Sequence, residues 1–201
     1  MNAKRSVAIA LVALFALGAQ GWGQSIVGSE HDFSNTSWAN GEICLPCHAP
    51  HNVPAGVNVL WNHETTTATF TMYSNLVSGN PVASQPGFLS KMCLSCHDGT
   101  TAVDSYGGQT GNQFITGDEL IGTDLSNDHP IGVEYPVGDP GYNPTTNFGQ
   151  PGEPKLVPIT LLNGNDGVEC VSCHNPHDDS NGKFLRVTDA ASALCLKCHN
   201  K

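Results

Sequence analysis

Four copies of the pattern Cys-x-x-Cys-His divide this chain, and they contain all eight of its cysteines. The copies are CLPCH at 44–48, CLSCH at 93–97, CVSCH at 170–174 and CLKCH at 195–199. The two thiols of such a pattern add to the vinyl groups of a haem, and the adjacent histidine binds the iron. The spacing therefore predicts four haem c groups and leaves no cysteine for a disulfide.

This interpretation assigns two sets of residues. The haem-attaching cysteines are Cys44, Cys47, Cys93, Cys96, Cys170, Cys173, Cys195 and Cys198. The proximal iron ligands are His48, His97, His174 and His199.

Eight cysteines in four CxxC pairs have two other common uses. Cys-x-x-Cys pairs also build zinc sites, and eight thiolates could make two clusters of four. An exported chain could instead use them as a disulfide framework. Neither alternative requires a histidine after every second cysteine or four identical spacings, so both are disfavoured.

The first 23 residues have the composition of a secretory signal. Lys4 and Arg5 precede an uncharged apolar run, Ser6–Ala19, which is shorter than the roughly 20 residues that span a bilayer. Small residues follow, without fixing the cleavage site, and a retained N-terminal anchor is the alternative. We expect export to the periplasm or the cell exterior, with no membrane span after signal removal.

Residues 24–201 have the length of one domain, but their composition is unusual for a globular chain. The sequence holds 22 Gly and 13 Pro, and such a chain buries little apolar surface to offset its conformational entropy. We therefore expect a mostly irregular coil in which stacked haems form the core. Short helices are expected at Gly87–Cys96 and at Thr188–Cys198, where Thr188 is a candidate N-cap.

The chain carries an internal duplication. GEICLPCHAPHN at 41–52 matches GVECVSCHNPHD at 167–178, and each copy is followed by a simpler motif. Two halves, about 28–100 and 160–201, result. The first half is longer, so an insertion is expected near Asn58–Pro86, and Gly99–Asp166 is expected to be a long connecting loop.

Five histidines remain for the distal iron positions. His51 and His177 each follow a proximal histidine by three residues, with Pro50 or Pro176 between them. So short a peptide cannot cross a porphyrin, so His51 cannot bind the iron of the haem held by His48, nor His177 that of the haem held by His174. Each must bind the iron of another haem, and each peptide would then hold two haems together. The predicted distal ligands are His31, His51, His129 and His177.

His63 is the least favoured of the five histidines, because Trp61 could pack on a haem with His63 only at the rim. His129 precedes Pro130, which favours an extended conformation at His129. An extended segment that passes a haem could present His129 as its ligand. Methionine is the rival ligand, and only Met72 and Met92 follow the signal.

The formal net charge is −10. So acidic a chain has no attraction to nucleic acid or to an anionic membrane surface. The net charge alone does not identify a redox partner.

The ordered set of motifs resembles a known family. CLPCHAPHN, LWNH, CLSCHDG, DHPIG and the closing CVSCHNPH and CLKCH are similar to the doubled-CxxCH multihaem c-type cytochromes over roughly 28–200. That family includes the tetrahaem subunits of extracellular cytochrome nanowires. The resemblance implies bis-histidine irons, stacked haems, and a histidine passed from one subunit to a haem in the next.

Three functions are consistent with these features. The favoured one is an electron-transfer subunit of a head-to-tail extracellular filament, with redox proteins or extracellular acceptors as partners. A soluble shuttle and a multihaem reductase are the alternatives. Histidines are in excess and every motif is complete, so no iron is expected to be open for catalysis and we expect no enzyme. His31, on a short N-terminal arm, is the expected ligand to a neighbouring subunit.

Overall fold

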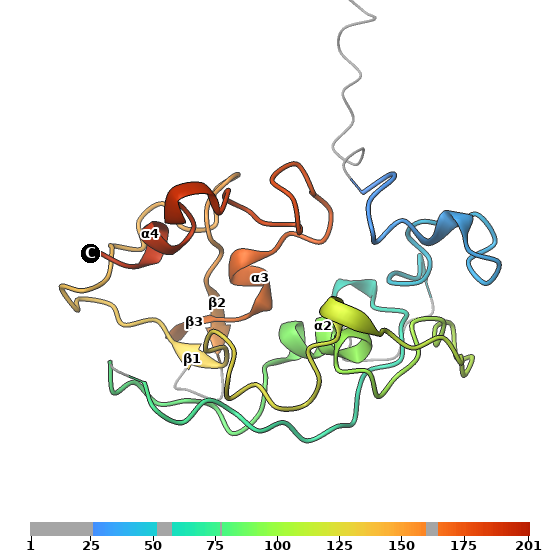
Figure 1. Cartoon of the computed structure of the whole chain (residues 1–201), viewed down its shortest axis with the longest axis horizontal. Helices are drawn as coiled ribbons and strands as arrows, with labels where there is room; N and C mark the ends of the chain where they lie inside the picture. The colour runs from blue at the N-terminus through green and yellow to red at the C-terminus, as the bar shows by residue number, and fades with distance from the viewer. Residues whose placement is uncertain (1–25, 52–57, 77, 160–164) are drawn as a thin grey trace, which may run out of the picture.

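The computed structural model describes residues 26–51, 58–76, 78–159 and 165–201. The predicted signal segment, residues 1–23, lies outside this part of the chain. Loops and turns make up most of what is described (Figure 1). The expectation of a mostly irregular chain with a few short helices is therefore confirmed.

The helical elements are short, and the CxxCH motifs supply the α-helical ones. The α-helices are α2 (Phe88–His97), α3 (Cys170–Cys173) and α4 (Cys195–Cys198). The 3-10 turns are η1 (Phe33–Asn35), η2 (Asn58–Leu60), η3 (Gly117–Glu119) and η5 (Ala190–Ser192).

Helix α2 matches the first predicted helix to within a residue. Its Leu, Lys and Met residues favour helix, and its buried face carries Met92 and Leu94. The helix ends where Asp98 donates its N–H to the Leu94 carbonyl and Gly99 takes a left-handed conformation, with φ of 73°. Glycine adopts that conformation without strain, so the sequence CHDG ends the helix.

The second predicted helix, Thr188–Cys198, is interrupted, so the expectation of one continuous helix is wrong. Ala191 and Ser192 take left-handed conformations, with φ of 53° and 62°, inside η5, so the helix begins again only at Cys195, as α4. Thr188 does accept a hydrogen bond at its Oγ1, from the N–H of Ala190. The good helix formers AASAL were insufficient because so short a helix has little intrinsic stability of its own.

A three-stranded antiparallel sheet lies between the halves of the chain. Its strands are β1 (Val133–Glu134), β2 (Val157–Ile159) and β3 (Asn165–Val168), in the order β1-β3-β2. Val133 pairs with Val168, and Val157 pairs with Gly167. Two of these strands lie inside Gly99–Asp166, so the expected loop contains ordered structure that attaches it to the second half.

The apolar core of protein side chains is small. Phe70, Leu94 and Leu125 form its buried cluster, and Met72 packs against them. These residues come from the inserted segment, from α2 and from the connector, so the cluster holds three distant parts of the chain together. None of the helices in the described ranges is long and apolar enough to cross a membrane.

Candidate haem-attachment sites

Each CxxCH motif closes one helical turn, which in the second motif is the end of the longer helix α2. The histidine N–H donates to the carbonyl of the first cysteine, at 2.8 Å from His48 to Cys44 and at 2.9 Å from His199 to Cys195. The bond from His174 measures 3.0 Å. A turn of this kind brings residues three and four apart to one face, so both thiols and the imidazole of a motif can meet one ligand.

Three proximal histidines have their ring tautomer fixed by the backbone. His48 Nδ1 lies 2.8 Å from the Val59 carbonyl oxygen, His97 Nδ1 lies 2.8 Å from Glu119 O, and His174 Nδ1 lies 2.9 Å from Lys183 O. Because a carbonyl only accepts, Nδ1 carries the hydrogen and Nε2 keeps its lone pair. An Nδ1–H bound to a carbonyl is the usual support of a metal-binding histidine.

Three of the four proximal histidines have a second histidine ring nearby. The ring centroids lie 5.8 Å apart for His48 and His177, 6.2 Å apart for His97 and His31, and 6.4 Å apart for His199 and His129. Metal–histidine bonds of about 2.0–2.1 Å place the centroids of two coaxial imidazoles about 6.4 Å apart. These separations suit an iron held between two rings.

One ring of each pair has a lowered pKa, which favours the neutral form that binds metal. Burial and the neighbouring His97 lower the pKa of His31 to about 4. Burial also lowers the pKa of His177, with His48 adding to the effect, and that of His199, with His129 adding to it. Neutral imidazoles are available as ligands across the physiological pH range.

His174 and His51 are left without such a pair. Both side chains are exposed, and neither ring contacts another aromatic ring among the described residues. His63 differs from both, because it is only 6% exposed. Its Nδ1 lies 2.7 Å from Glu64 O, and its Nε2 lies 3.1 Å from Ala102 O and 3.5 Å from Cys96 Sγ, so both ring nitrogens face backbone carbonyls and Nε2 also contacts a thiol.

The arrangement of the cysteines gives no support to zinc binding or to disulfides. All eight thiols are free, although every one lies in the described part of the chain. The described residues contain no group of three or more Cys, His, Asp or Glu side chains that could hold a metal ion. Burial raises the pKa of Cys47 to about 11 and that of Cys96 to about 12, so these thiols are not poised as zinc-binding thiolates.

Thiols of successive motifs approach one another along the chain. Cys47 adds to the raised pKa of Cys96, and Cys195 adds to that of Cys173. Cys93 and Cys170 are hydrogen bonded, and this contact together with burial raises the pKa of Cys93. The four motifs therefore lie next to one another in sequence order.

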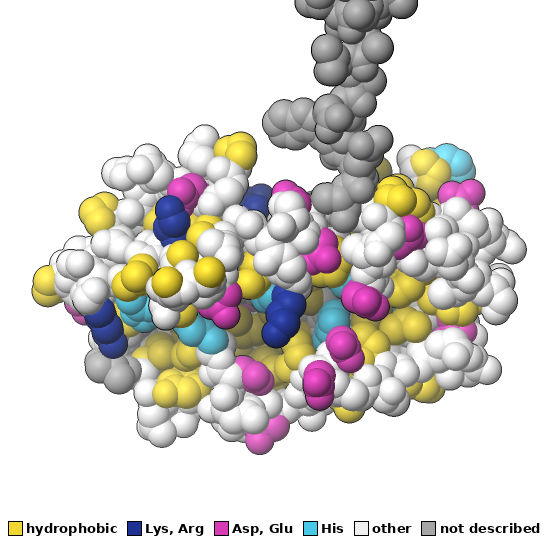
Figure 2. Space-filling view, turned by 45° about the horizontal axis from the view of Figure 1, so that its top comes forward, with side chains coloured by type: hydrophobic (Ala, Val, Ile, Leu, Met, Phe, Trp, Pro, Cys, Tyr) yellow, Lys and Arg dark blue, Asp and Glu magenta, His cyan; other side chains and the backbone are white. Residues whose placement is uncertain are grey.

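The surroundings of the motifs fit a haem. The indole Nε1 of Trp61 is the one buried side-chain nitrogen or oxygen in the described residues that has no hydrogen-bond partner. Trp61 lies edge-on to His48, with ring centroids 6.2 Å apart, where a haem propionate could accept its hydrogen. Figure 2 shows histidine and hydrophobic side chains together along a hollow in one face, as a large apolar ligand with a central metal requires.

Sequence reasoning identified the histidines and cysteines but missed the residues that hold them. The carbonyls of Val59, Glu119 and Lys183 carry no signal in the sequence, because any residue supplies a carbonyl. Trp61 was noticed only as a packing partner, although an indole beside a CxxCH motif suggests a hydrogen-bond donor to a propionate.

The donor set and its geometry define a protein that binds haem covalently through CxxCH motifs. Residues 164–201 match a family described as the doubled CXXCH motif. The match covers the third and fourth motifs and supports a multihaem c-type cytochrome that functions in electron transfer. A comparison with curated proteins gave no match.

Proposed function

We propose that this chain is a tetrahaem electron-transfer cytochrome whose copies join head to tail into an extracellular filament. Bound haem supplies a one-electron iron couple at each motif. The chain's own residues would attach the group by two thiols, bind its iron from both sides and exclude water. With two histidines on each iron no open position remains, so we propose no catalytic activity.

The observation that carries the filament proposal is that one proximal histidine and one distal histidine candidate of the same chain are both unpaired with another histidine ring in the described residues. Within the part of the chain that the structure describes, His174 presents Nε2 without a partner ring, and His51 is exposed without one. His31, the ligand first expected to be exchanged, stacks on Phe184 at 4.2 Å and already faces His97 of its own chain. We therefore propose His51 as the histidine that binds a haem iron of the neighbouring subunit.

Pairing His51 of one copy with His174 of the next gives a heterologous contact. A heterologous contact that does not close into a ring continues as a filament. Such a contact would also bring a haem of each copy to the boundary between subunits, so electrons could pass from copy to copy. The terminal acceptor would be a redox protein or an extracellular oxidant.

The test is an electron micrograph of the secreted wild-type protein beside its His51→Ala variant. We expect filaments from the wild type, and single subunits with one high-spin haem per chain from His51→Ala. Adding His51→Ala subunits to growing wild-type filaments should shorten them, because each variant chain keeps His174 but offers no ligand. His63→Gln is the matched control and should form filaments.

Two other results would contradict the proposed filament function. A monomeric wild type with every iron low-spin would mean that His51 binds within its own chain. The protein would then be a soluble shuttle. A high-spin iron in the wild-type filament would point instead to a reductase.

A further inference from the structure

Three of the four motifs are crossed by a short segment with the same backbone pairing. These clamp segments are residues 59–62 for the first motif, 183–186 for the third and 140–143 for the fourth. Each forms an antiparallel bridge to the motif histidine, pairing His48 with Trp61, His174 with Leu185 and His199 with Tyr142. The first and third clamps follow their motif in the chain, whereas the fourth motif's clamp precedes it.

The main-chain hydrogen bonds of the clamps are equivalent as well. In the first motif, Asn62 donates its N–H to Cys47 O at 2.9 Å. Arg186 donates likewise to Cys173 O and Asn143 to Cys198 O, each at 2.8 Å. Asn62, Arg186 and Asn143 thus occupy the same position, the last of each clamp.

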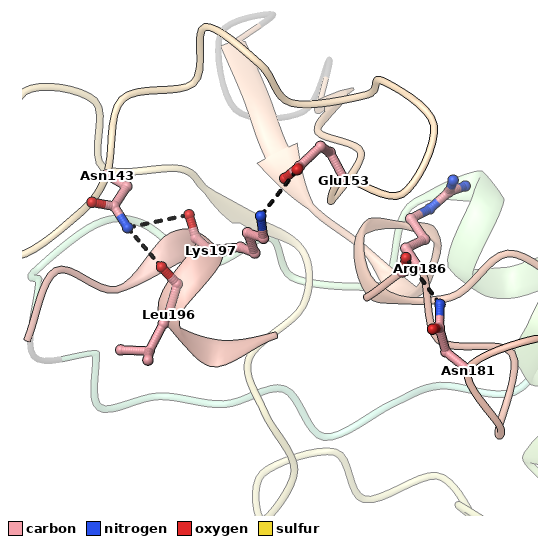
Figure 3. Close-up of polar contacts among 6 residues, drawn as sticks. All are labelled: Asn143, Glu153, Asn181, Arg186, Leu196 and Lys197. Atoms are coloured by element: carbon pink, nitrogen blue, oxygen red, sulfur yellow. Dashed lines mark hydrogen bonds and ion pairs between the residues drawn. The ribbon is translucent and has the colours of Figure 1, made fainter. Parts of the chain in front are cut away.

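The side chains at this position repeat a further contact. Asn62 Nδ2 donates to Leu45 O at 2.7 Å, and Asn143 Nδ2 donates to Leu196 O at 2.8 Å. Figure 3 shows the Asn143 amide over the turn of α4. Arg186 Nε donates to a carbonyl, Val171 O, at 2.8 Å. In all three cases the acceptor is the residue that follows the first cysteine.

A physical reason for the contact lies in the shortness of these turns. The last four carbonyls of any helix have no partner within it, and a helix of one turn consists of such ends. Helix α2 is longer, and there the equivalent carbonyl, Leu94 O, receives the N–H of Asp98 at 2.8 Å. The second motif needs no side-chain donor at this carbonyl, whereas the three short motifs each receive one from a clamp.

We infer that Asn62, Asn143 and Arg186 are equivalent positioning residues for haem attachment. By holding the carbonyl after the first cysteine, each keeps its turn closed, with both thiols and the histidine on one face. Among the described residues, their side-chain hydrogen bonds go to backbone carbonyls and not to the cysteines' sulfurs or the motif histidines' ring nitrogens, so they act through the turn. The inference rests on covalent haem binding and is independent of whether the chain forms filaments.

The fourth motif offers the cleanest test, because two asparagines of different role lie at it. Asn143 donates to the turn, whereas Asn200 Nδ2 donates to Pro140 O, in the clamp itself, at 3.0 Å. Asn143→Leu removes the donor to the turn while keeping the branching and the number of side-chain heavy atoms, and Asn200→Leu is the matched control. Both are compared with the wild-type holoprotein.

Two measurements separate positioning from a general loss of stability. Amide hydrogen exchange of the peptide spanning residues 195–199 should be about fivefold faster in Asn143→Leu, the effect of one net hydrogen bond. The peptide spanning residues 93–97 should be unchanged. Peptide mass mapping should find haem attached through only one of Cys195 and Cys198 in part of the Asn143→Leu chains. Equal results for Asn143→Leu and Asn200→Leu would overturn the inference.

The third motif supplies a second test should Asn143→Leu fail to mature. Glutamine Nε2 lies as many bonds from Cα as arginine Nε, so Arg186→Gln keeps the donor in place while Arg186→Met removes it. We expect Gln to preserve wild-type exchange and complete attachment at residues 170–174, and Met to lose both. If Gln and Met behave alike, the donor is not what positions the turn.

Discussion

Histidine pairs are the features at residue scale that connect the motifs. His177 lies three residues past His174, yet its ring faces His48 of the first motif at 5.8 Å. A peptide of four residues thus presents one imidazole to its own motif and another to a motif in the other half. The two halves are tied together wherever an iron is bound between His48 and His177.

Replacing His177 with alanine tests this pair. We expect one haem to change from low to high spin, because His48 would remain as the only protein ligand on that iron. Electron paramagnetic resonance of the oxidised protein measures the change.

His63→Gln serves as the control for His177→Ala, since both ring nitrogens of His63 face carbonyls. It should leave all irons low-spin. A wild-type spectrum for His177→Ala would refute the pairing with His48.

Much of the haem site at residue scale is predictable from sequence, because the chemistry resides in identifiable side chains. The argument that His177 must serve an iron other than that of His174 needs only the length of three residues, and the ring contact to His48 agrees with it. The partner of each distal histidine was not predictable, because it depends on how distant loops cross. The choice of His31 as the exchanged ligand had the same weakness, and its contact with His97 now favours a role within the chain.

At the scale of elements, a buried carboxylate joins helix α2 to helix α3. Glu169 is 3% exposed and accepts a hydrogen bond from Ser90 Oγ, itself fully buried. Glu169 and Ser172 also form a capping box at the start of α3. A Cβ on Gly87 would collide with the Glu169 carboxylate, so the close approach of the two helices requires glycine there.

We predict that Glu169→Ala lowers the free energy of unfolding by about 1–3 kcal/mol, because it leaves the buried Ser90 hydroxyl without its acceptor. Glu169→Gln keeps an acceptor and should lose less. Denaturant unfolding of the holoprotein measures both. A loss equal to that of an exposed control, Glu42→Ala, would mean that the contact contributes nothing.

The pH dependence of the free energy of unfolding is a second way to test the role of Glu169. Burial raises the pKa of Glu169, against the lowering effect of Ser90 and Gly87. A raised pKa means that the folded state prefers the protonated acid, so this contribution is present at acidic pH and falls as pH rises through the folded pKa. Glu169→Gln should flatten that part of the stability profile.

The elements themselves were predictable where local sequence is strong. The CHDG ending and the apolar face of α2 specified that helix to within a residue. The helix expected at Thr188–Cys198 breaks at Ala191, whose left-handed conformation no propensity indicates. Residues 59–62 have a counterpart in 183–186, so the extra chain of the first half follows Asn62, within the Asn58–Pro86 region expected for the insertion.

On the scale of the whole molecule, protein side chains alone make too little core for a chain of this length. The buried cluster consists of Phe70, Leu94 and Leu125 with a few partly buried neighbours. We therefore expect covalently bound haem, a large rigid apolar group, to supply most of the remaining core. That part of the fold could be anticipated only from the motifs, because hydrophobic periodicity is weak.

The mass of the mature protein should therefore contain four haem increments, one for each motif. Intact mass spectrometry after denaturation measures it, since thioether bonds survive unfolding. Replacing Cys195 and Cys198 with alanine should remove one increment and leave three. A wild-type mass with fewer than four would show that a complete CxxCH motif is not sufficient here.

An iron bound between His48 and His177, as we propose, would also set an order of events in an exported chain. A chain that crosses a membrane from its N-terminus delivers the first motif long before residue 177 emerges. The first haem can be attached early, but its iron must wait for nearly the entire chain before its second ligand arrives. Binding of the second ligand to the first haem would then be among the last steps of maturation. An unfinished chain could be recognised by an open coordination position on its first haem.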